Sequence, residues 1–160
     1  MIDKRYRITK ILSTEGASCI VYKAFDTEKQ VNVVLKIFKD NWPKMLQRKE
    51  VEAMQGINHP NVVKLLDHHF SQGEGDPSYL VMAEIGQAQD LFDYLRTFES
   101  KRIPEEEALH ILRQLLDAIE HLHDKKVVHK DIKLDNVLID QNKKVTLIDL
   151  GLAIKADDHR

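Results

Sequence analysis

Short β-prone runs fill the first half of the chain. The pattern predicts five strands at residues 6–12, 20–24, 30–38, 62–66 and 79–83. The third run shows the pattern most clearly, because Val31, Val33 and Leu35 alternate with the residues between them. One helix is predicted from Pro43 to Gln55, since proline suits a first helical turn and Gly56 suits a C-terminal cap. Residues 1–84 are therefore expected to form a small α+β unit.

The pattern changes after Glu84. Residues 86–89 are predicted to be a short linker, and residues 90–126 have a helical period. A long helix opens at Pro104 with three glutamates, which are favourable at the positive end of a helix dipole. Its apolar positions cover roughly half of the circumference, whereas a surface helix has a stripe of about 100°. We therefore expect this helix to need neighbours on more than one side.

Three polar side chains flank two short apolar strands near the end of the chain. The strands are predicted at residues 137–139 and 145–148, with Asn136 before the first and Asp149 after the second. A hairpin of this kind brings Asp131, Asn136 and Asp149 around one small volume. Oxygen ligands suit divalent cations, and magnesium in particular. The sequence therefore predicts a site for a metal ion and a phosphorylated ligand.

A single lysine, Lys36, lies within the valine-rich third strand. A buried ammonium group needs a partner, and Glu50 or Glu52 of the predicted helix could provide one. The alternative is an edge-strand lysine whose head group reaches solvent. The pattern alone leaves both open.

Composition narrows the class of protein. The chain has 160 residues and a net charge of −2, which gives no support for a nucleic-acid partner or an acidic lipid surface. Its single cysteine, Cys19, excludes an intrachain disulfide and fits a reducing compartment. No apolar run approaches 18 residues, so no transmembrane helix is predicted. His121 and His123 are two residues apart on a helix and point to different sides, which disfavours a zinc site there. We expect an intracellular protein, cytoplasmic or nuclear, with no membrane partner.

Four segments, in this order along the chain, resemble the motifs of protein kinases. Residues 21–24 resemble the end of the glycine-rich loop, and residues 33–36 resemble V-A-I-K. Residues 129–136 resemble the catalytic loop H-R-D-x-K-x-x-N, and residues 149–151 resemble D-F-G. The resemblance implies an α+β, protein-kinase-like fold: an N-lobe (1–84) with five strands and one helix, a hinge (85–89), and the first, mainly helical part of a C-lobe (90–160).

The same resemblance implies a function. The chain would be an ATP-dependent protein serine/threonine kinase domain that uses Mg²⁺ and transfers the γ-phosphate to a protein hydroxyl. The implied catalytic residues are Asp131, Lys133, Lys36 and Glu50, and the implied metal ligands are Asn136 and Asp149. Glu50 is preferred over Glu52 because its distance from His59-Pro60 matches the family's helix-to-turn spacing. The implied ATP-binding residues are Leu12, Gly16, Val21, Val34, Lys36, Ala83, Glu84, Gly86 and Leu138. Met82 would replace Ala83 at the back of the pocket if the hinge were shifted by one residue.

Some positions depart from the family pattern. The three glycine places of the loop hold Thr14, Gly16 and Cys19, so only the middle glycine is present. A glycine lets backbone N–H groups approach phosphates without a Cβ in the way, so the other two residues should weaken or reshape those contacts. Lys130 replaces the usual arginine, and Leu150 replaces the phenylalanine of D-F-G. These departures leave an alternative, a catalytically impaired, pseudokinase-like module for nucleotide binding or scaffolding.

The C-terminal end also departs from the family. The sequence stops nine residues after Gly151, before the segments that complete a second lobe, so we expect an incomplete kinase domain. The apolar face of the helix at residues 104–124 would then be exposed or covered by a partner chain. In a complete domain the partners would be ATP and a serine/threonine protein substrate, and the truncated chain is expected to transfer phosphate poorly.

Overall fold

The structure is a computed structural model, and it describes residues 1–156. The last four residues of the predicted segment 90–160 lie outside the described residues. The chain divides into two compact units, one formed by Met1–Val51 with Leu65–Glu84 and the other by Glu52–Lys64 with the residues from Ile85 onward. The boundary after Glu84 lies where the sequence pattern changes. Residues 52–64, expected in the first unit, group with the second.

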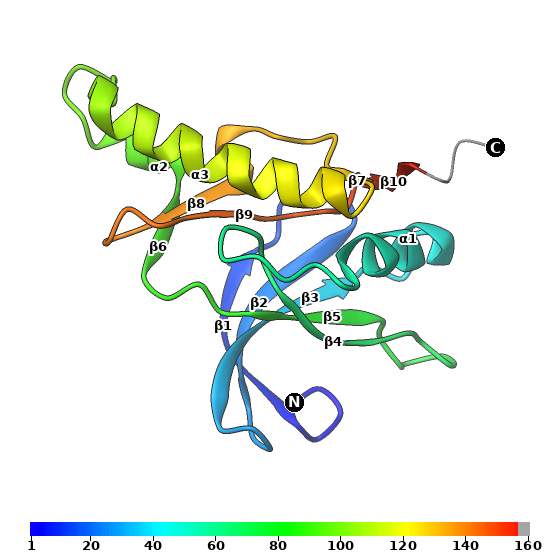
Figure 1. The fold of residues 1–160 in the computed structure, drawn as a ribbon. Coiled ribbons are helices and arrows are strands. Elements are labelled where there is room, and N and C mark those ends of the chain that lie inside the picture. Colours follow the sequence, from blue (N-terminus) through cyan, green and yellow to red (C-terminus); the bar gives the residue numbers. More distant parts are fainter. Residues whose placement is uncertain (157–160) are drawn as a thin grey trace. The chain divides into compact units, whose positions relative to one another are not determined.

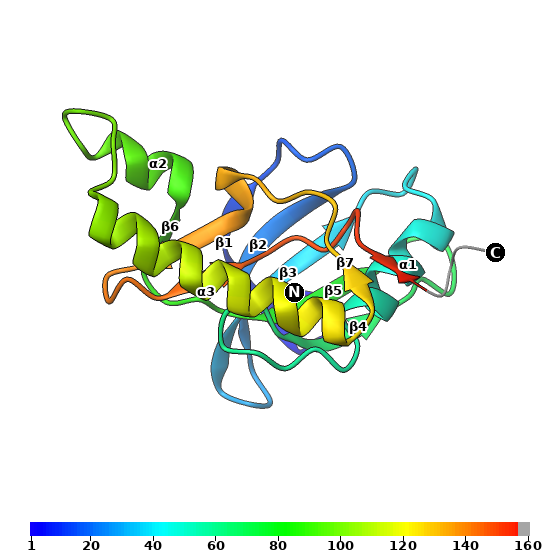
Figure 2. The same cartoon turned by 45° about the horizontal axis from the view of Figure 1, so that its top comes forward.

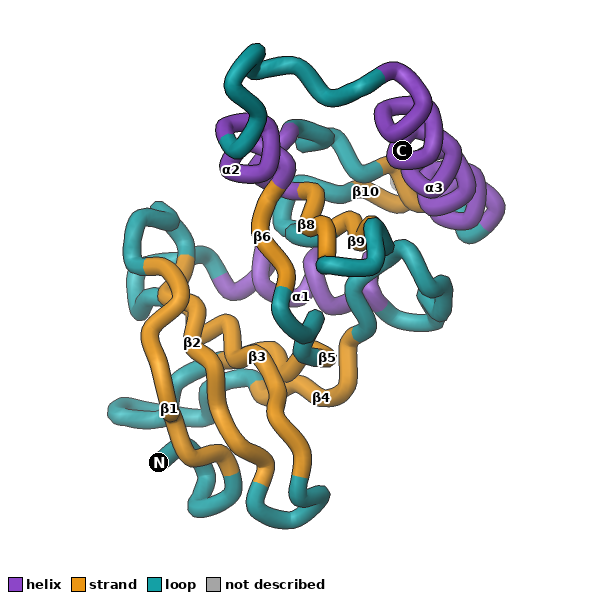
Figure 3. Tube along the Cα trace, turned by 90° about the vertical axis from the view of Figure 1, so that its left-hand side faces the viewer, coloured by secondary structure: helices purple, strands orange, loops and turns teal. Residues whose placement is uncertain are grey.

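The first unit contains a five-stranded antiparallel sheet. Its strands are β1 (Tyr6–Ser13), β2 (Cys19–Asp26), β3 (Val31–Phe38), β4 (Leu65–His69) and β5 (Tyr79–Ala83). They lie side by side in the order β1-β2-β3-β5-β4, as Figure 3 shows. The predicted α+β class with a five-stranded sheet is therefore confirmed.

The two faces of this sheet differ because side chains alternate along each strand. One face forms the hydrophobic core of the unit, and its buried members are Tyr6, Ala24, Val33, Leu35, Tyr79 and Val81. On the other face, Lys36 of β3 pairs with Val21 of β2 and with Leu80 of β5. Directly paired residues share a face, so these three side chains lie on the side opposite the core.

Helix α1 (Lys44–Met54) lies between β3 and β4 in sequence, close to the predicted range Pro43–Gln55. Pro43 precedes it, and the Pro43 carbonyl accepts the N–H groups of Leu46 and Gln47. Gly56 follows it with φ +78°, the left-handed conformation that helix ends favour and that glycine adopts without strain. The local sequence therefore sets both ends of this helix.

The predicted strand at residues 62–66 is wrong in position. Strand β4 begins at Leu65, whereas Val62 forms a parallel bridge with Leu147 and the Val63 N–H donates to the Leu147 carbonyl at 2.9 Å. Val62 and Val63 are buried within the second unit. A continuous apolar run indicates burial but does not identify the strand with which it pairs.

The second unit contains a small sheet and two helices. The sheet has the order β6-β8-β9, with β6 (Ala88–Asp90), β8 (Val137–Asp140) and β9 (Val145–Leu147). Helix α2 (Leu91–Arg96) is followed by α3 (Glu105–Asp124), and α3 packs along the hairpin of β8 and β9 (Figure 1). The predicted hairpin is present. The predicted linker at residues 86–89 is corrected, because its last two residues belong to β6, which pairs with the distant β8.

Helix α3 has one buried and one exposed apolar side. Its buried residues include Ile111, Ala118 and Leu122, whereas three leucines are about half exposed, Leu109 at 46%, Leu112 at 49% and Leu116 at 53%. Figure 2 shows α2 close to the first turns of α3, where the Tyr94 hydroxyl donates to the Glu107 carboxylate. Among the described residues, no helix is both long and apolar enough to cross a membrane.

Two short elements complete the described part of the second unit. Strand β7 (Val127–Val128) pairs with β10 (Ile154–Lys155), and a 3₁₀ turn, η1, covers Leu134–Asn136. The turn leads directly into β8. It therefore places Asn136 at the beginning of the hairpin.

Candidate active site

In the first unit, Lys36 forms a buried ion pair with Glu50 of α1. The distance between Lys36 Nζ and Glu50 Oε1 is 2.6 Å, and the two residues are only 6% and 3% exposed. Of the two interpretations of Lys36, the structure therefore shows the paired one, and the carboxylate is that of Glu50, whereas Glu52 is exposed. At this depth the ammonium position is fixed by the pairing, since leaving either charge unpaired would be costly.

In the second unit, Asn136 and Lys133 both contact Asp131. The Asn136 side-chain nitrogen Nδ2 donates to the Asp131 backbone oxygen at 2.8 Å and to its carboxylate Oδ2 at 2.9 Å. Lys133 Nζ lies 3.1 Å from the same carboxylate oxygen, and this hydrogen bond raises the pKa of Lys133. The carboxylate is thus oriented by a neutral donor and a cation while remaining partly exposed.

His129 is a positioning residue to which sequence reasoning assigned no role. It is 3% exposed, and its Nδ1 accepts the Asp131 backbone N–H at 3.2 Å. Because Nδ1 is an acceptor, the neutral ring carries its proton on Nε2, which donates to the Ile148 carbonyl at 3.0 Å. His129 therefore joins the backbone of Asp131 to the residue before Asp149. Its place two residues before Asp131 in the motif was the signal available in the sequence.

Asp149 begins the turn after β9. Its φ is +60°, a left-handed conformation that aspartate tolerates better than most residues, and its Oδ1 accepts the Gly151 N–H at 3.2 Å. The preceding residue, Ile148, donates its N–H to the Asn136 carbonyl at 2.9 Å. Asn136 and Asp149, far apart in sequence, are thus held next to one another through the hairpin.

The residues at this turn fit a magnesium ion that phosphates help to coordinate. Among the described residues, no group of three or more His, Cys, Asp or Glu side chains is arranged to hold a metal alone. Magnesium bound with nucleotides uses one or two protein oxygen ligands plus phosphates and waters, so such a group is not required. The Asn136 amide donates both of its hydrogen bonds to Asp131 from Nδ2, which orients Oδ1 as the atom available to a cation. The carboxylate of Asp149 would supply a second oxygen ligand to such an ion.

Several of the predicted ATP-binding residues share one face of the first unit's sheet. Val34 lies two residues from Lys36 on β3, and Val21 pairs directly with Lys36, so both lie on the Lys36 face. Ala83 pairs with Val33 and therefore lies on the opposite, core-bearing face. The alternative residue, Met82, pairs with Val34 and lies on the Lys36 face, so strand register favours Met82, and the part of either residue in nucleotide binding stays a prediction. The reason is the two-residue period of a strand, since a shift of one residue reverses the face.

The loop between β1 and β2 is compact around its single glycine. A Cβ added to Gly16 would lie 3.3 Å from the backbone oxygen of Cys19, tighter than nearly all natural contacts. The Gly16 carbonyl also accepts the Lys39 ammonium at 2.7 Å. Cys19 is buried at 7% exposure, whereas Leu12, at the end of β1, is about half exposed. A side chain at position 16 would therefore require the Cys19 backbone to shift by a few tenths of an ångström, and the Cys19 side chain is buried.

The remaining predicted ATP-binding residues are Glu84, Gly86 and Leu138. Glu84 follows β5 in the first unit, and its carboxylate pairs with the Lys23 ammonium of β2. In the second unit, Gly86 accepts the Ala88 N–H at 3.2 Å, and Leu138 of β8 is half-buried opposite Asp90 of β6. The structure thus places these residues on two different units, and their part in nucleotide binding stays a prediction.

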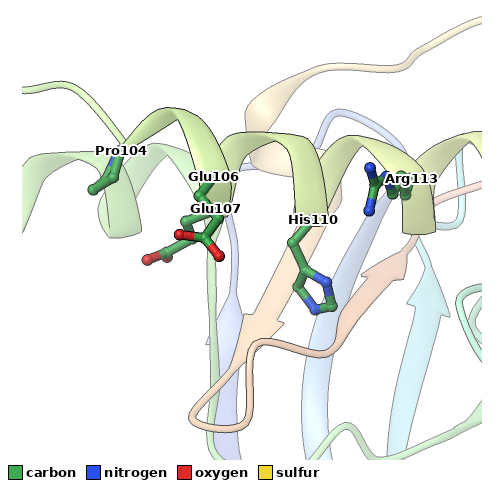
Figure 4. Close-up of a pocket in the computed structure, with 5 residues that line it drawn as sticks. All are labelled: Pro104, Glu106, Glu107, His110 and Arg113. Atoms are coloured by element: carbon green, nitrogen blue, oxygen red, sulfur yellow. The ribbon is translucent and has the colours of Figure 1, made fainter.

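A surface pocket on α3 is separate from these residues. It has a cavity volume of about 450 Å³ and is lined by Pro104, Glu106, Glu107, His110 and Arg113, which Figure 4 shows along the N-terminal half of the helix. None of the predicted catalytic, metal or ATP-binding residues lines it. Glu107 itself accepts from Tyr94 and from Lys143, at 3.1 Å from the Lys143 Nζ, and these hydrogen bonds, Tyr94 first, lower the pKa of its carboxyl group. Its carboxylate therefore joins α3 to α2 and to the β8–β9 turn.

A comparison with protein families agrees with this geometry. The sequence model of the family described as "Protein kinase domain" matches residues 7–160. The chain belongs to the protein kinase family. This assigns the five-stranded unit, the buried Lys36–Glu50 pair and the Asp131 loop to one known architecture.

Curated relatives are also kinases by name. The chain is 40% identical over 118 residues to "Hormonally up-regulated neu tumor-associated kinase homolog" of Xenopus tropicalis, covering 74% of this chain and 16% of that protein. It is 38% identical over 115 residues to "Hormonally up-regulated neu tumor-associated kinase" of Homo sapiens, covering 72% and 15%. It is 34% identical over 115 residues to "NUAK family SNF1-like kinase 2" of Pongo abelii, covering 72% and 17%. The chain therefore spans about a sixth of the length of these relatives. By resemblance it is classed with the protein serine/threonine kinases.

Proposed function

We propose that the chain catalyses, with Mg²⁺, the transfer of the ATP γ-phosphoryl group to a serine or threonine hydroxyl of a protein. The observation that carries this proposal is the arrangement around Asp131, whose Oδ2 contacts both Asn136 and Lys133. A carboxylate held in this way can accept a hydrogen bond and a proton from an alcohol. A lysine within contact distance can offset charge on a phosphoryl group.

The roles follow from the position of each group. Asp131 accepts the hydrogen bond of the substrate hydroxyl and takes its proton as the new O–P bond forms. The bond between the γ-phosphorus and the oxygen bridging to the β-phosphate breaks in the same step, and ADP leaves. Lys133 neutralises charge on the γ-phosphate, since a lysine side chain carries a positive charge at neutral pH. Phosphoryl transfer depends mainly on positioning and charge neutralisation, so the fixed geometry of these side chains is the main contribution of the protein.

Lys36 binds the α- and β-phosphates in this proposal, and Glu50 positions it. Their 2.6 Å contact prevents the ammonium from turning away from the face that also bears Val21 and Val34. Met82 is the residue of β5 that we assign to the adenine side of that face. When bound, magnesium neutralises the phosphate charges, and Asn136 and Asp149 are the residues that would hold it.

A second candidate function is a nucleotide-binding or scaffolding module that transfers no phosphate. The observation that favours it is the loop at Gly16, where Cys19 occupies a glycine place and a Cβ added to Gly16 would lie only 3.3 Å from the Cys19 backbone oxygen. A loop fixed in this way could bind phosphates in a geometry that does not support transfer.

Two measurements separate these functions. Calorimetric titration with Mg²⁺ and ATP tests binding, and transfer of ³²P from ATP to a generic serine/threonine peptide tests catalysis. For a kinase, we expect binding, and Asp131→Asn should lower transfer by about 100-fold or more, the usual contribution of a positioned acid or base. The matched control is Asp135→Asn, an exposed aspartate of the same loop, which should leave transfer unchanged.

Each result has one interpretation. ATP binding with no phosphate transfer would favour the nucleotide-binding module. No ATP binding at about millimolar concentration would contradict both the kinase and the nucleotide-binding module, and would leave only the scaffolding role. Transfer that survives Asp131→Asn unchanged would contradict the role assigned to Asp131.

We further propose that a partner chain, a second copy of this one in the simplest case, covers the half-exposed leucines of α3. Contiguous apolar surface of this kind usually marks a contact site. Light scattering should then show a dimer that Leu112→Asp abolishes, and a strict monomer at high concentration would contradict a second copy.

We also propose a cytoplasmic or nuclear location, which the single free cysteine favours and which imaging of a fluorescent fusion would test.

A further inference from the structure

Two histidines of the second unit form a stacked pair away from the Asp131 loop. His59, in the segment after α1, and His121, near the end of α3, have ring centroids 5.0 Å apart and planes inclined by 29°. His59 Nδ1 accepts the Asn61 backbone N–H at 3.1 Å, so the neutral ring carries its proton on Nε2. His121 Nε2 is buried and has no hydrogen-bond partner within residues 1–156. Among the described residues, neither His59 Nδ1 nor His121 Nε2 therefore has an acceptor to which a further ring proton could donate.

Protonation conflicts with both environments. An imidazolium ion donates from both nitrogens, so a proton added to His59 must occupy Nδ1, where it faces the Asn61 N–H that Nδ1 now accepts. A protonated His121 places a donor on Nε2, where no acceptor lies among the described residues. Two cationic rings in a stack would also repel each other.

The charged groups around the pair do not remove this conflict. Burial and the neighbouring His121 lower the pKa of His59, and the carboxylate of Asp117, one helical turn before His121, opposes them only in part. Asp124 and Lys125 lie at the end of the same helix and carry opposite charges. The strands that pack on α3, β7 and β9, have no titratable side chain, and His59 is the single titratable residue of 55–61.

The histidine pair adjoins a hydrogen-bond network centred on Asn61. The Asn61 Nδ2 donates to the Val145 carbonyl at 2.6 Å and to Gln114 Oε1 at 3.0 Å, and the Asn61 carbonyl accepts the Leu147 N–H at 2.8 Å. Gln114 Oε1 also accepts the Val145 N–H at 2.9 Å. These bonds attach residues 59–63 to both α3 and β9, and the Nδ1 atom of His59 fixes the backbone at their start.

We propose that the stacked His59–His121 pair is a proton-sensitive latch, which holds residues 59–63 against α3 and β9 when neutral and releases them on proton uptake. The segment is released in the mildly acidic range, because each bound proton removes an acceptor or adds a buried donor. Release would loosen β9, two residues before Asp149, and so would couple pH to the position of that turn. The latch is a property of the fold and does not depend on phosphoryl transfer.

The sign of the effect follows from linkage. The pKa of His59 is lower in the attached state than its ordinary value. Above the ordinary pKa, the neutral ring therefore stabilises the attached state fully. This stabilisation is lost as the pH falls from the ordinary pKa through the lowered pKa. Each pKa unit of lowering changes the equilibrium between attached and released states about tenfold.

The test is hydrogen exchange of the whole protein. Exchange of the Asn61, Val63 and Leu147 amides is compared at about pH 7.5 and about pH 5.5, on either side of the ordinary histidine value, after correction for the intrinsic rate. We expect the opening constant of these amides to rise on acidification in the wild type. The opening constant should rise less in His121→Phe, because phenylalanine keeps a stacked ring but cannot bind a proton. His123→Gln removes an exposed histidine of the same helix and should behave as the wild type.

A second measurement follows the His59 ring directly. The His59 ring is titrated by NMR, and its midpoint should lie below 6.5, the ordinary value. In His121→Phe, the midpoint should move back toward that value. A midpoint at or above 6.5, or an equal pH dependence of exchange in wild type and His121→Phe, would overturn the proposal.

Discussion

The carboxylate of Asp26 allows a quantitative test of what stabilises the first unit, which contains Lys36 on strand β3. Asp26 is 1% exposed and accepts two hydrogen bonds from Arg5, at 2.9 Å from Nε and 2.7 Å from Nη2. It also accepts the backbone N–H groups of Glu28 at 3.0 Å and Lys29 at 3.1 Å. The Arg5 hydrogen bond, followed by the backbone donors, lowers the pKa of Asp26 from 3.8 to about 2.

The free energy involved follows from this difference in pKa. A lowering of almost two units corresponds to about 2.5 kcal/mol of folding stability near neutral pH. Because the pKa is lowered in the folded state, this stability is fully present above 3.8 and is lost as pH falls toward 2. About half of it should remain at about pH 3.

The assay is urea unfolding of wild type and Asp26→Asn at a series of pH values. Near neutral pH, we expect the variant to be about 2–3 kcal/mol less stable, with the difference decreasing steadily at acidic pH. The matched control is Glu28→Gln, because Glu28 lies 3.2 Å from Arg5 Nε but its side chain is 68% exposed. An exposed pair of this kind should contribute less than about 1 kcal/mol.

Two results would refute this reasoning. One is a stability difference for Asp26→Asn that does not change with pH. The other is a control variant as unstable as Asp26→Asn, which would show that general charge balance, rather than the buried hydrogen bonds, stabilises this end of the sheet.

Three further substitutions test other parts of the structure. Glu50→Gln removes the carboxylate that pairs with buried Lys36, so we expect a loss on the order of 3 kcal/mol in urea unfolding and weaker ATP binding by calorimetry; unchanged ATP affinity would contradict the role of Glu50. Asn61→Ala leaves the buried Val145 carbonyl without its side-chain donor and should cost about 1–3 kcal/mol, with faster exchange of the Leu147 amide. Gly56→Ala places a Cβ at φ +78° and should lower the melting temperature through a cost of about 1–2 kcal/mol, although no atom lies within 4 Å of the new methyl group.

Local sequence determined much of the fold and of the candidate site. The strands around Val33, the helix before Gly56 and the hairpin from Asn136 follow from periodicity and end signals, which depend on residues close in the chain. The residues proposed for catalysis could be named because residues 129–136 resemble the catalytic loop of protein kinases, and this one short segment contains Asp131, Lys133 and Asn136. The contacts of Asp131 with Lys133 and Asn136 are all formed between residues of that loop.

Tertiary structure decided what depends on distant partners. The choice of Met82 over Ala83 rests on strand register, which a local pattern cannot fix, because a shift of one residue reverses the face. The backbone partners of Val62 and Ala88 lie more than 45 residues away in sequence. His129 and the His59–His121 stack likewise gain their significance only through hydrogen bonds and ring contacts between separate segments. The sequence by itself determined the elements and the chemical groups of this kinase-family chain, and the packing of distant segments decided which of those groups face one another.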